Sequence, residues 1–355
     1  MFKSVGFQTL LLSTASLHLL LLVSSAHSQL TFFSTHPEPA DGYAISAIDI
    51  THDGQVFAVG CADANAYVYG RDGIGFTHLL NLTEGSSRMH ELAMSGDGQW
   101  MAASFEDGTV KVYSAVSAGR FQLAQTLSIT GDTSPAFSVS MTDDNQWLAV
   151  GKLSGQAYVF KHNGAGFELN ETVSVGNDIT SVALSDDHQM LAVGTEGDTY
   201  IYKFGSTFSL NQTISLTPYV EKKISLTPDQ QHLTISLNTV VSIYQNTQTQ
   251  FELLESIQLS RDSTFSSISP NKELLLISTS HETYVYANAT TGNTSLVQTL
   301  AGSLMHAFSE QSEYVVLGKE NEVHVYLYCD YDQSGGFYNA TEGFCHCQPE
   351  KDRFF

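Results

Sequence analysis

The chain repeats one pattern of apolar and polar positions seven times. Each copy contains an apolar run that ends in Gly or Ser, as in "DGQVFAVG", "DNQWLAVG" and "SEYVVLG". Successive runs are 40 to 47 residues apart, and a period near this length is typical of propeller blades built from four strands. The residues that end these anchor runs are Gly60, Ser104, Gly151, Gly194, Ser236, Ser278 and Gly318.

Four short runs in each copy have the composition of β-strands. The run before the anchor run ("TSVALS"), the anchor run itself and the two runs after it ("TYIYK" and "FSLNQTISL") are rich in β-branched and aromatic residues. Gly, Asp, Asn and Ser separate the runs, and these residues favour tight turns. Beyond the N-terminal segment, no stretch keeps the apolar period of a helix.

The seventh copy lacks its fourth run, and the N-terminal part of the chain offers a replacement. Residues 30–37, "LTFFSTHP", resemble the fourth run of the other copies. Pairing this segment with the last copy closes the ring and removes exposed strand edges at the seam. The sequence therefore predicts an all-β, seven-bladed propeller of four-stranded blades, whose last blade is closed by the N-terminal strand.

The repeats also resemble known propeller families. The stretches "SVALSDDHQMLAVG", "DTYIYKFGSTFSLNQTISL" and "SVSMTDDNQWLAVG" carry the resemblance. Over residues 30–328 the array is similar to secreted propellers with FG-GAP-type repeats and to WD-repeat (YVTN-like) propellers. The Trp-Asp dipeptide of WD repeats is replaced by runs such as "AYVYG", and the blades lack the Asp-x-Asp-x-Asp-Gly calcium loop. The resemblance thus implies the fold without calcium-dependent adhesion by the blades.

Residues 1–28 have the features of a secretory signal peptide. Lys3 supplies a positive charge, residues 9–23 form an apolar run, and Ala26 and Ser28 are small residues before the expected cleavage site. The alternative is an uncleaved anchor, although an apolar run of about 15 residues is short for the roughly 20 that span a bilayer. We expect a secreted protein, extracellular or in the secretory lumen, with no membrane span after cleavage. Its candidate N-glycosylation sites are Asn81, Asn170, Asn211, Asn288, Asn293 and Asn339.

The cysteines also fit an oxidising compartment, where an even number predicts disulfides. They are Cys61, Cys329, Cys345 and Cys347, which allow three pairings. A bond between Cys345 and Cys347 would close a strained ring. We therefore expect Cys329 to pair with one of these two and Cys61 with the other. The alternative for Cys61 is a buried thiol.

The chain divides into a signal peptide at 1–28, a propeller at 29–328 and a short Cys-containing tail at 329–355. Within the tail, Asp330 and the residues after it fit the start of an EF-hand calcium loop. The Glu that should end such a loop, Glu342, is one residue late. Calcium-dependent adhesion through the tail is one alternative function, and the preferred prediction includes no metal.

An acidic excess limits the classes of partner. The formal net charge is −22, the sequence pI is about 4.7, and only 15% of the residues are charged. Few cations are available to displace counterions from phosphate or to dock on anionic lipid. The composition therefore argues against a nucleic-acid-binding protein and suits a soluble extracellular one.

An acidic turn precedes most anchor runs. In "SDDHQ", Asp186, Asp187 and His188 stand together as metal ligands or an acid–base pair might. The equivalent segments are "THDGQ", "SGDGQ", "TDDNQ", "TPDQQ" and "SPNKE". Because Asp, Gly, Asn and Pro are the residues that tight turns require, the sequence predicts a recurring turn here.

The innermost strands are expected to line a central channel with small neutral side chains. The ionisable residues predicted there are Asp49, Glu91 and Lys223. An enzyme on this fold would usually gather several His, Asp, Glu or Arg at the axis, so we expect no catalysis and no cofactor. The alternative is a lactonase-like or lyase-like enzyme that uses these three residues.

The loops that join one copy to the next form the best candidate binding surface, because loops on a rigid scaffold often carry binding residues. Several of the chain's few cations collect there. The sequence predicts a scaffold that binds a protein or glycan through this rim. The candidate residues are Arg88, His90, Tyr219, Lys222 and Arg261.

Overall fold

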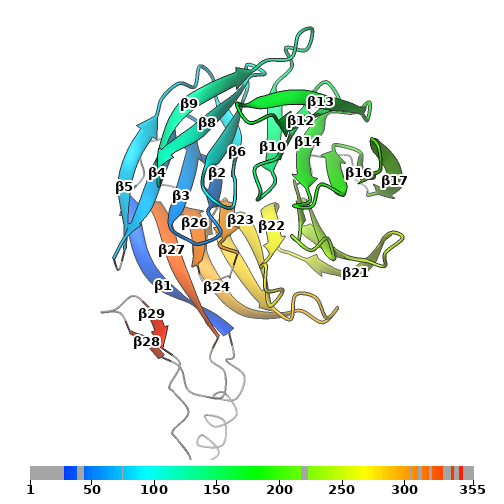
Figure 1. The fold of residues 1–355 in the computed structure, drawn as a ribbon. Coiled ribbons are helices and arrows are strands. Elements are labelled where there is room, and N and C mark those ends of the chain that lie inside the picture. The colour runs from blue at the N-terminus through cyan, green and yellow to red at the C-terminus, as the bar shows by residue number, and fades with distance from the viewer. Residues whose placement is uncertain are drawn as a thin grey trace, which may run out of the picture.

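Seven sheets surround a central axis in a computed structural model of the chain (Figure 1). Strands within each sheet run antiparallel, and no helix occurs among the described residues. The predicted all-β, seven-bladed propeller is confirmed. The structure describes residues 28–37, 44–73, 75–216, 223–303, 305–310, 314–319, 322–330, 337–339 and 344–346.

Blades 1 to 5 each contain four consecutive strands, named here from the axis outward. Blade 1 consists of β2 (Ile45–Ile50), β3 (Val56–Cys61), β4 (Ala66–Asp72) and β5 (Gly75–Leu82). Blade 2 consists of β6 (Met89–Met94), β7 (Trp100–Phe105), β8 (Val110–Ser117) and β9 (Arg120–Leu127). Blade 3 consists of β10 (Ala136–Met141), β11 (Trp147–Lys152), β12 (Gln156–His162) and β13 (Phe167–Ser174).

The next two blades follow the same order. Blade 4 consists of β14 (Ile179–Leu184), β15 (Met190–Thr195), β16 (Asp198–Phe204) and β17 (Phe208–Ser215). Blade 5 consists of β18 (Lys223–Leu226), β19 (His232–Leu237), β20 (Val240–Asn246) and β21 (Phe251–Gln258). A separate two-stranded hairpin in the tail is formed by β28 (Phe337–Asn339) and β29 (Phe344–His346).

Blade 6 contains one long strand that serves as two. Its strands are β22 (Ser263–Ile268), β23 (Leu274–Ala287) and β24 (Ser295–Ser303). The first half of β23 pairs with β22, and the second half pairs with β24. The direction reverses between Thr279 and Glu282, where the Thr279 hydroxyl accepts the Glu282 N–H at 3.0 Å. This blade is therefore four-stranded like the others.

Blade 7 is completed from the other end of the chain. Its strands are β25 (Met305–Phe308), β26 (Tyr314–Lys319), β27 (Glu322–Asp330) and, on the outside, β1 (Ser28–Pro37). The N-terminal strand pairs antiparallel with β27 along its length. The predicted closure by residues 30–37 is confirmed, and β27 has no exposed edge at this seam.

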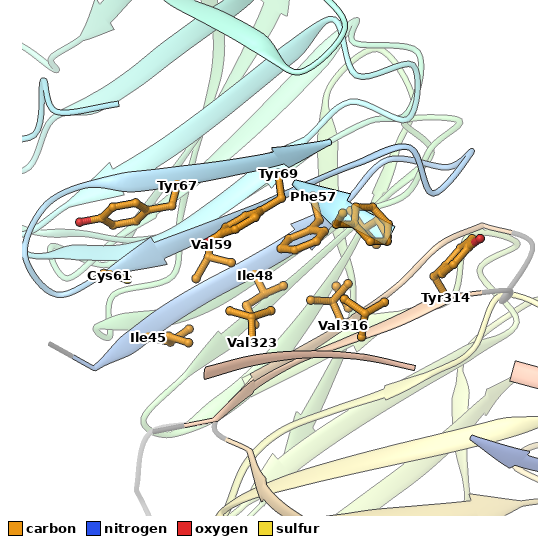
Figure 2. Close-up of a cluster of buried hydrophobic side chains, with 14 of the residues drawn as sticks. Ile45, Ile48, Phe57, Val59, Cys61, Tyr67, Tyr69, Tyr314, Val316 and Val323 are labelled. Atoms are coloured by element: carbon orange, nitrogen blue, oxygen red, sulfur yellow. The ribbon is translucent and has the colours of Figure 1, made fainter. Parts of the chain in front are cut away.

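Neighbouring blades pack through the apolar side chains of their inner strands. Figure 2 shows the seam at which Ile48 and Phe57 of blade 1 meet Tyr314 and Val316 of blade 7. All four side chains are buried, and burial of a side chain of this size contributes about 1.5–3 kcal/mol. Aromatic contacts add to this packing, because the Phe76 ring meets the Tyr314 ring edge-on at 5.9 Å. The seam is thus packed as a continuous core.

The small residue that ends each anchor run lies against the next blade. A Cβ atom on Gly60 would lie 2.4 Å from Met89 Sδ, and one on Gly318 would lie 2.8 Å from Ile48 Cδ1. Both distances are far shorter than a carbon or sulfur contact allows. The Gly or Ser that ends each anchor run therefore marks a position where neighbouring blades approach closely. The same close approach recurs around the ring.

The outer strands of blades 1 to 5 are longer than the inner strands, which contain six residues or, in β18, four. Strands β5, β9, β13, β17 and β21 each contain eight residues. Their pairing with the third strand shifts register at least once in each of these blades, for example between Val159 and Phe160. Such a bulge bends and twists the outer strand, which suits the wide outer part of a blade.

Some sequence predictions fall outside the described residues. These include the signal peptide before residue 28, most of the tail, and the side chains of Cys329, Cys345 and Cys347. Cys61 is fully buried at the seam between blades 7 and 1. Its disulfide and the tail's proposed calcium loop remain predictions. In the ranges that the structure describes, no helix is long and apolar enough to cross a bilayer.

The closing strand should contribute strongly to stability. Leu30 is only 3% exposed between blades 6 and 7, and its N–H donates to Gln298 Oε1 at 3.0 Å. Replacement Leu30→Ala should lower the free energy of unfolding by about 3 kcal/mol through lost burial and a cavity. Urea denaturation followed by circular dichroism measures this change.

A leucine on the outer surface provides the matched control. Leu253 is 58% exposed on β21, so Leu253→Ala should change the free energy of unfolding by less than about 0.5 kcal/mol. Equal effects of the two replacements would show that β1 does not close the ring in solution.

Candidate functional site

Two cavities lie at opposite ends of the inner strands. One, of about 300 Å³, extends from the inner strands to the turns that link first and second strands. The other, of about 410 Å³, lies among the loops that join one blade to the next. We call these ends the lower mouth and the upper mouth. Both are lined by residues from most of the blades, which places them on the axis.

The turn at the lower mouth is held by one set of hydrogen bonds. In blade 4 the Ser185 hydroxyl accepts the Met190 N–H at 2.9 Å and donates to the Asp187 carboxylate at 2.8 Å. The same carboxylate accepts the Gln189 N–H at 2.9 Å, and His188 has a φ of 57°. These side-chain to backbone bonds are the mechanism by which Ser and Asp favour turns. The prediction that Asp187 and His188 are turn residues is confirmed.

This turn recurs around the ring. In the other six blades a hydroxyl accepts the backbone N–H five residues later at 2.9 to 3.1 Å. The hydroxyls belong to Thr51, Ser95, Thr142, Thr227, Ser269 and Ser309. The residue equivalent to His188 has a positive φ, which Gly adopts without strain. These equivalents are Gly54, Gly98, Asn145, Gln230 and Lys272.

The residue after the hydroxyl lies on the channel side of the turn. Asp186 is a turn residue, as the sequence predicts, and it also lines the lower cavity. The turn's own side-chain bonds use the residues on either side of it, so this position is open to vary. We define the lower mouth by the seven equivalent residues, His52, Gly96, Asp143, Asp186, Pro228, Pro270 and Glu310.

Ionisable side chains meet at the lower mouth. His52 Nε2 lies 2.6 Å from Asp143 Oδ2, and His52 Nδ1 lies 2.9 Å from Glu310 Oε2. The Asp143 N–H donates to Asp186 Oδ1 at 3.3 Å. The hydrogen bond to Asp143 raises the pKa of His52, and burial together with the Asp143 charge raises the pKa of Asp186. The sequence signal for this cluster was the residue that follows the hydroxyl in each turn, which is ionisable in four blades and Gly or Pro in the other three.

Two of the predicted channel residues link neighbouring blades. Asp49 Oδ2 accepts the Met94 N–H of the next blade at 2.7 Å, and Glu91 Oε2 accepts the Val139 N–H at 3.1 Å. Burial raises the pKa of Asp49 to about 7. Both carboxylates line the lower cavity, but their oxygens are engaged by backbone donors. They act as inter-blade ties.

Lys223 lies at the other end of the channel. Its Nζ donates to the Thr180 carbonyl at 3.3 Å and lies 5.1 Å from the centre of the Phe137 ring. It lines the upper cavity, whereas Asp49 and Glu91 line the lower one. The structure therefore does not bring the three predicted channel residues together in one cavity, which weighs against a site formed by all of them.

A buried histidine lies between two serines beside the channel. His306 Nε2 is 2.8 Å from Ser267 Oγ, and His306 Nδ1 is 2.7 Å from Ser278 Oγ. This resembles a hydroxyl with an oriented base, but burial lowers the pKa of His306 to about 3. A base with that pKa is a poor acceptor for a hydroxyl proton at neutral pH. The geometry favours a structural tie between blades 6 and 7.

The upper mouth combines basic, aromatic and polar groups. The His90 ring stacks on Phe137 at 4.4 Å, and its Nε2 bonds to Glu106. Burial lowers the pKa of His90 against the opposing effect of Glu106, and the positive charges of Arg88 and Lys223 lower it further. The side chains with polar or aromatic groups in this cavity include Arg88, His90, Phe137, Lys223, Asn238 and Asp262.

The predicted rim residues separate into three groups. Arg88 and His90 lie together in the upper mouth. Arg261 is exposed beside it, next to the lining residue Asp262. Tyr219 and Lys222 lie outside the described residues. Sequence analysis missed Phe137 and Asn238, because Phe137 occupies a strand position that reads as ordinary core. Across the residues described, no three His, Cys, Asp or Glu are grouped to hold a metal ion.

A comparison with protein families agrees with this architecture. Residues 78–114 match the model of the WD domain, G-beta repeat. The match begins in β5 of blade 1 and ends in β8 of blade 2, so the sequence repeat is offset from the blade by one strand. The same offset leaves β1 to complete blade 7.

Seven four-stranded blades and this match define a WD-repeat-like propeller. A WD-repeat propeller suggests a scaffold for protein interactions, and such propellers are typically not catalytic. No curated protein matches the chain.

His306 should make the fold sensitive to acid. Its pKa of about 3 in the folded chain is below the ordinary value of 6.5, so the unfolded chain binds the proton more tightly. Its contribution is complete above pH 6.5 and is lost as the pH falls towards 3, by up to about 5 kcal/mol. Replacement His306→Asn should flatten the acid limb of a stability–pH curve.

The exposed His78 provides the control, because it lies on an outer strand away from the axis. His78→Asn should leave the acid limb unchanged. An acid limb that is the same in His306→Asn as in the unchanged protein would contradict the assignment.

Proposed function

We propose that this protein is a secreted scaffold that binds a protein or glycan through the upper mouth and its rim, without catalysis. The observation that carries the proposal is the upper cavity of about 410 Å³, a concave site at the axis lined by strand ends and adjoining loop residues of six blades. Sites of this kind, with apolar walls and a few polar groups, are where rigid scaffolds bind ligands. The WD-repeat match supports a protein as the partner.

Positive charge at the upper mouth indicates the chemistry of the partner. Arg88 is exposed, and among the described residues it has no ion-pair partner. Lys223 lies in the same cavity, and Arg261 is exposed nearby. These cations belong to a chain with a formal net charge of −22. A partner that presents carboxylates would be attracted to this mouth and repelled by most of the remaining surface.

The channel chemistry favours binding over catalysis. Asp49 and Glu91 accept backbone N–H groups of neighbouring blades, and His306 has a pKa far below neutrality. General acid–base catalysis needs a group that exchanges protons near the working pH and reaches the substrate. Asp49 has a pKa of about 7, but each of its carboxylate oxygens accepts a backbone N–H, from Ile50 and from Met94, so it is held as a tie between blades.

The secreted location rests on the sequence and is compatible with the surface. Residues 1–28 have the features of a signal peptide. Five sequon asparagines lie on exposed positions, where an attached glycan would have room. They are Asn81, Asn170, Asn211, Asn288 and Asn293.

Charge reversal at the rim tests the binding face. The triple variant Arg88→Glu, Lys222→Glu and Arg261→Glu should lose at least 10-fold in affinity for partners that the unchanged secreted protein captures. The physical reason is that three attractive charges become repulsive towards an acidic partner. Affinity capture from culture medium, followed by titration of each captured partner, measures the loss.

The exposed Arg120 supplies a matched control on the hairpin between β8 and β9. Arg120→Glu should keep every partner at its original affinity. Partners that bind the triple variant as tightly as the control would exclude the rim as the binding face.

A further inference from the structure

The lower mouth holds blades together through one imidazole. His52 extends from blade 1 and contacts Asp143 of blade 3 at 2.6 Å and Glu310 of blade 7 at 2.9 Å. Blade 7 is the blade that both ends of the chain complete. One side chain thus connects the closing seam to a blade two positions further around the ring.

A chain of backbone hydrogen bonds runs beneath these contacts. The Glu310 N–H donates to the His52 carbonyl at 3.2 Å, and the His52 N–H donates to Gly96 at 3.1 Å. The Gly96 N–H donates to Asp143 at 3.1 Å, and the Asp143 N–H reaches the Asp186 carboxylate at 3.3 Å. This arc joins blades 7, 1, 2, 3 and 4.

Two prolines occupy the equivalent positions in blades 5 and 6. Pro228 and Pro270 have no N–H, so neither can donate a bond of this kind. The ties across the lower mouth are therefore concentrated in the half of the ring where His52 and its carboxylates lie.

The charged groups facing His52 are almost all acidic. Asp143 and Glu310 contact it directly. The charge of Asp186 raises the pKa of His52, and the charge of His52 lowers the pKa of Asp49. The cavity is also lined by Glu91 and His306, and its described lining includes no Lys or Arg. Without its proton, His52 would leave a group of carboxylates with no positive charge between them.

We propose that the lower mouth is a pH-sensitive latch, in which protonated His52 holds blades 7, 1 and 3 together and loss of its proton loosens the mouth. Only the imidazolium has two N–H donors, so it alone can satisfy Asp143 and Glu310 at once. A neutral imidazole donates to one carboxylate and turns a lone pair towards the other. This inference rests on the lower mouth and holds whether or not the upper mouth binds a partner.

The proton equilibria at this mouth all act in the same direction. The pKa of His52 is raised by its bond to Asp143, the pKa of Asp186 by burial and the Asp143 charge, and that of Asp49 to about 7 by burial. Each group binds its proton more tightly in the folded chain than in the unfolded chain. Stability from this cluster is therefore greatest in mild acid and falls as the pH rises through neutrality.

Histidines with lowered pKa values act in the opposite direction, from about pH 6.5 downward. Among the described histidines whose pKa differs from the ordinary value of 6.5, only His52 has a raised pKa. The pKa values of four others are shifted downward, so these rings are already neutral above pH 6.5. They are His90, His188, His232 and His306.

The melting temperature between pH 5.5 and 8.5 tests the latch. From pH 6 to pH 8, the unchanged full-length protein should lose on the order of 5 °C relative to the His52→Gln variant, which carries the same lowered-pKa histidines. His52→Gln should lower the value at pH 6 and leave the value at pH 8.5 nearly unchanged. Asp186→Asn, which mimics the protonated carboxyl, should raise the value at pH 8 and make the slope shallower.

Hydrogen exchange locates the change within the molecule. After correction for the intrinsic pH dependence of exchange, the turns at 50–56, 94–100 and 141–147 should lose protection from pH 6 to pH 8, while the upper-mouth segment 88–90 should not. Exposed controls are His78→Gln and Asp72→Asn, which should keep the original pH profile. A His52→Gln variant that loses equal stability at pH 6 and pH 8.5, or an Asp186→Asn variant with an unchanged slope, would overturn the proposal.

Discussion

Close contact between the inner strands of neighbouring blades is the constraint on which the rest of this structure depends. A single four-stranded blade leaves two apolar faces exposed, and each face is buried only by another blade. The contact is tight enough that the residue opposite the next inner strand is Gly or Ser, as the short distance from a Cβ on Gly60 to Met89 shows. Blade 7 is completed because β1 returns from the N-terminus and pairs with the edge of β27 as its outer strand. Each blade is therefore stabilised by its neighbours.

Repetition of one turn follows from this constraint and leaves one position available for function. The hydroxyl, the Asp or Asn two residues later and the residue with positive φ are fixed by their hydrogen bonds. The side chain of the residue after the hydroxyl makes none of these bonds and lies at the axis. In five blades this position carries a side chain that can titrate or a glycine, and in two it carries proline. At the other end of the axis, loops of different sequence create a mouth with basic and aromatic groups.

The fold could be predicted from the sequence because every blade repeats the same evidence. A single short apolar run does not establish a strand, but seven copies with a similar spacing do. The absence of a fourth run in the seventh copy indicated that the N-terminal strand closes the ring. The site could be predicted only in part. Arg88 and His90 were recognised from loop position and charge, and both line the upper mouth. The turn at Asp186 was predicted correctly, but its place in the channel was not, because a one-residue difference within a turn decides whether a side chain faces solvent, the turn or the channel. The separation of Lys223 from Asp49 depends on position along the channel, which alternation along a strand does not give.

Photo-crosslinking from the two mouths tests the central claim, that partners bind at the upper mouth, most directly. Benzoylphenylalanine would replace Phe137 in one sample and Pro228 in another, because these residues line the upper and the lower cavity respectively. The samples would be irradiated in the medium of the cells that secrete the protein. The account predicts protein adducts from position 137 and none from position 228. Adducts from position 228 alone would contradict it.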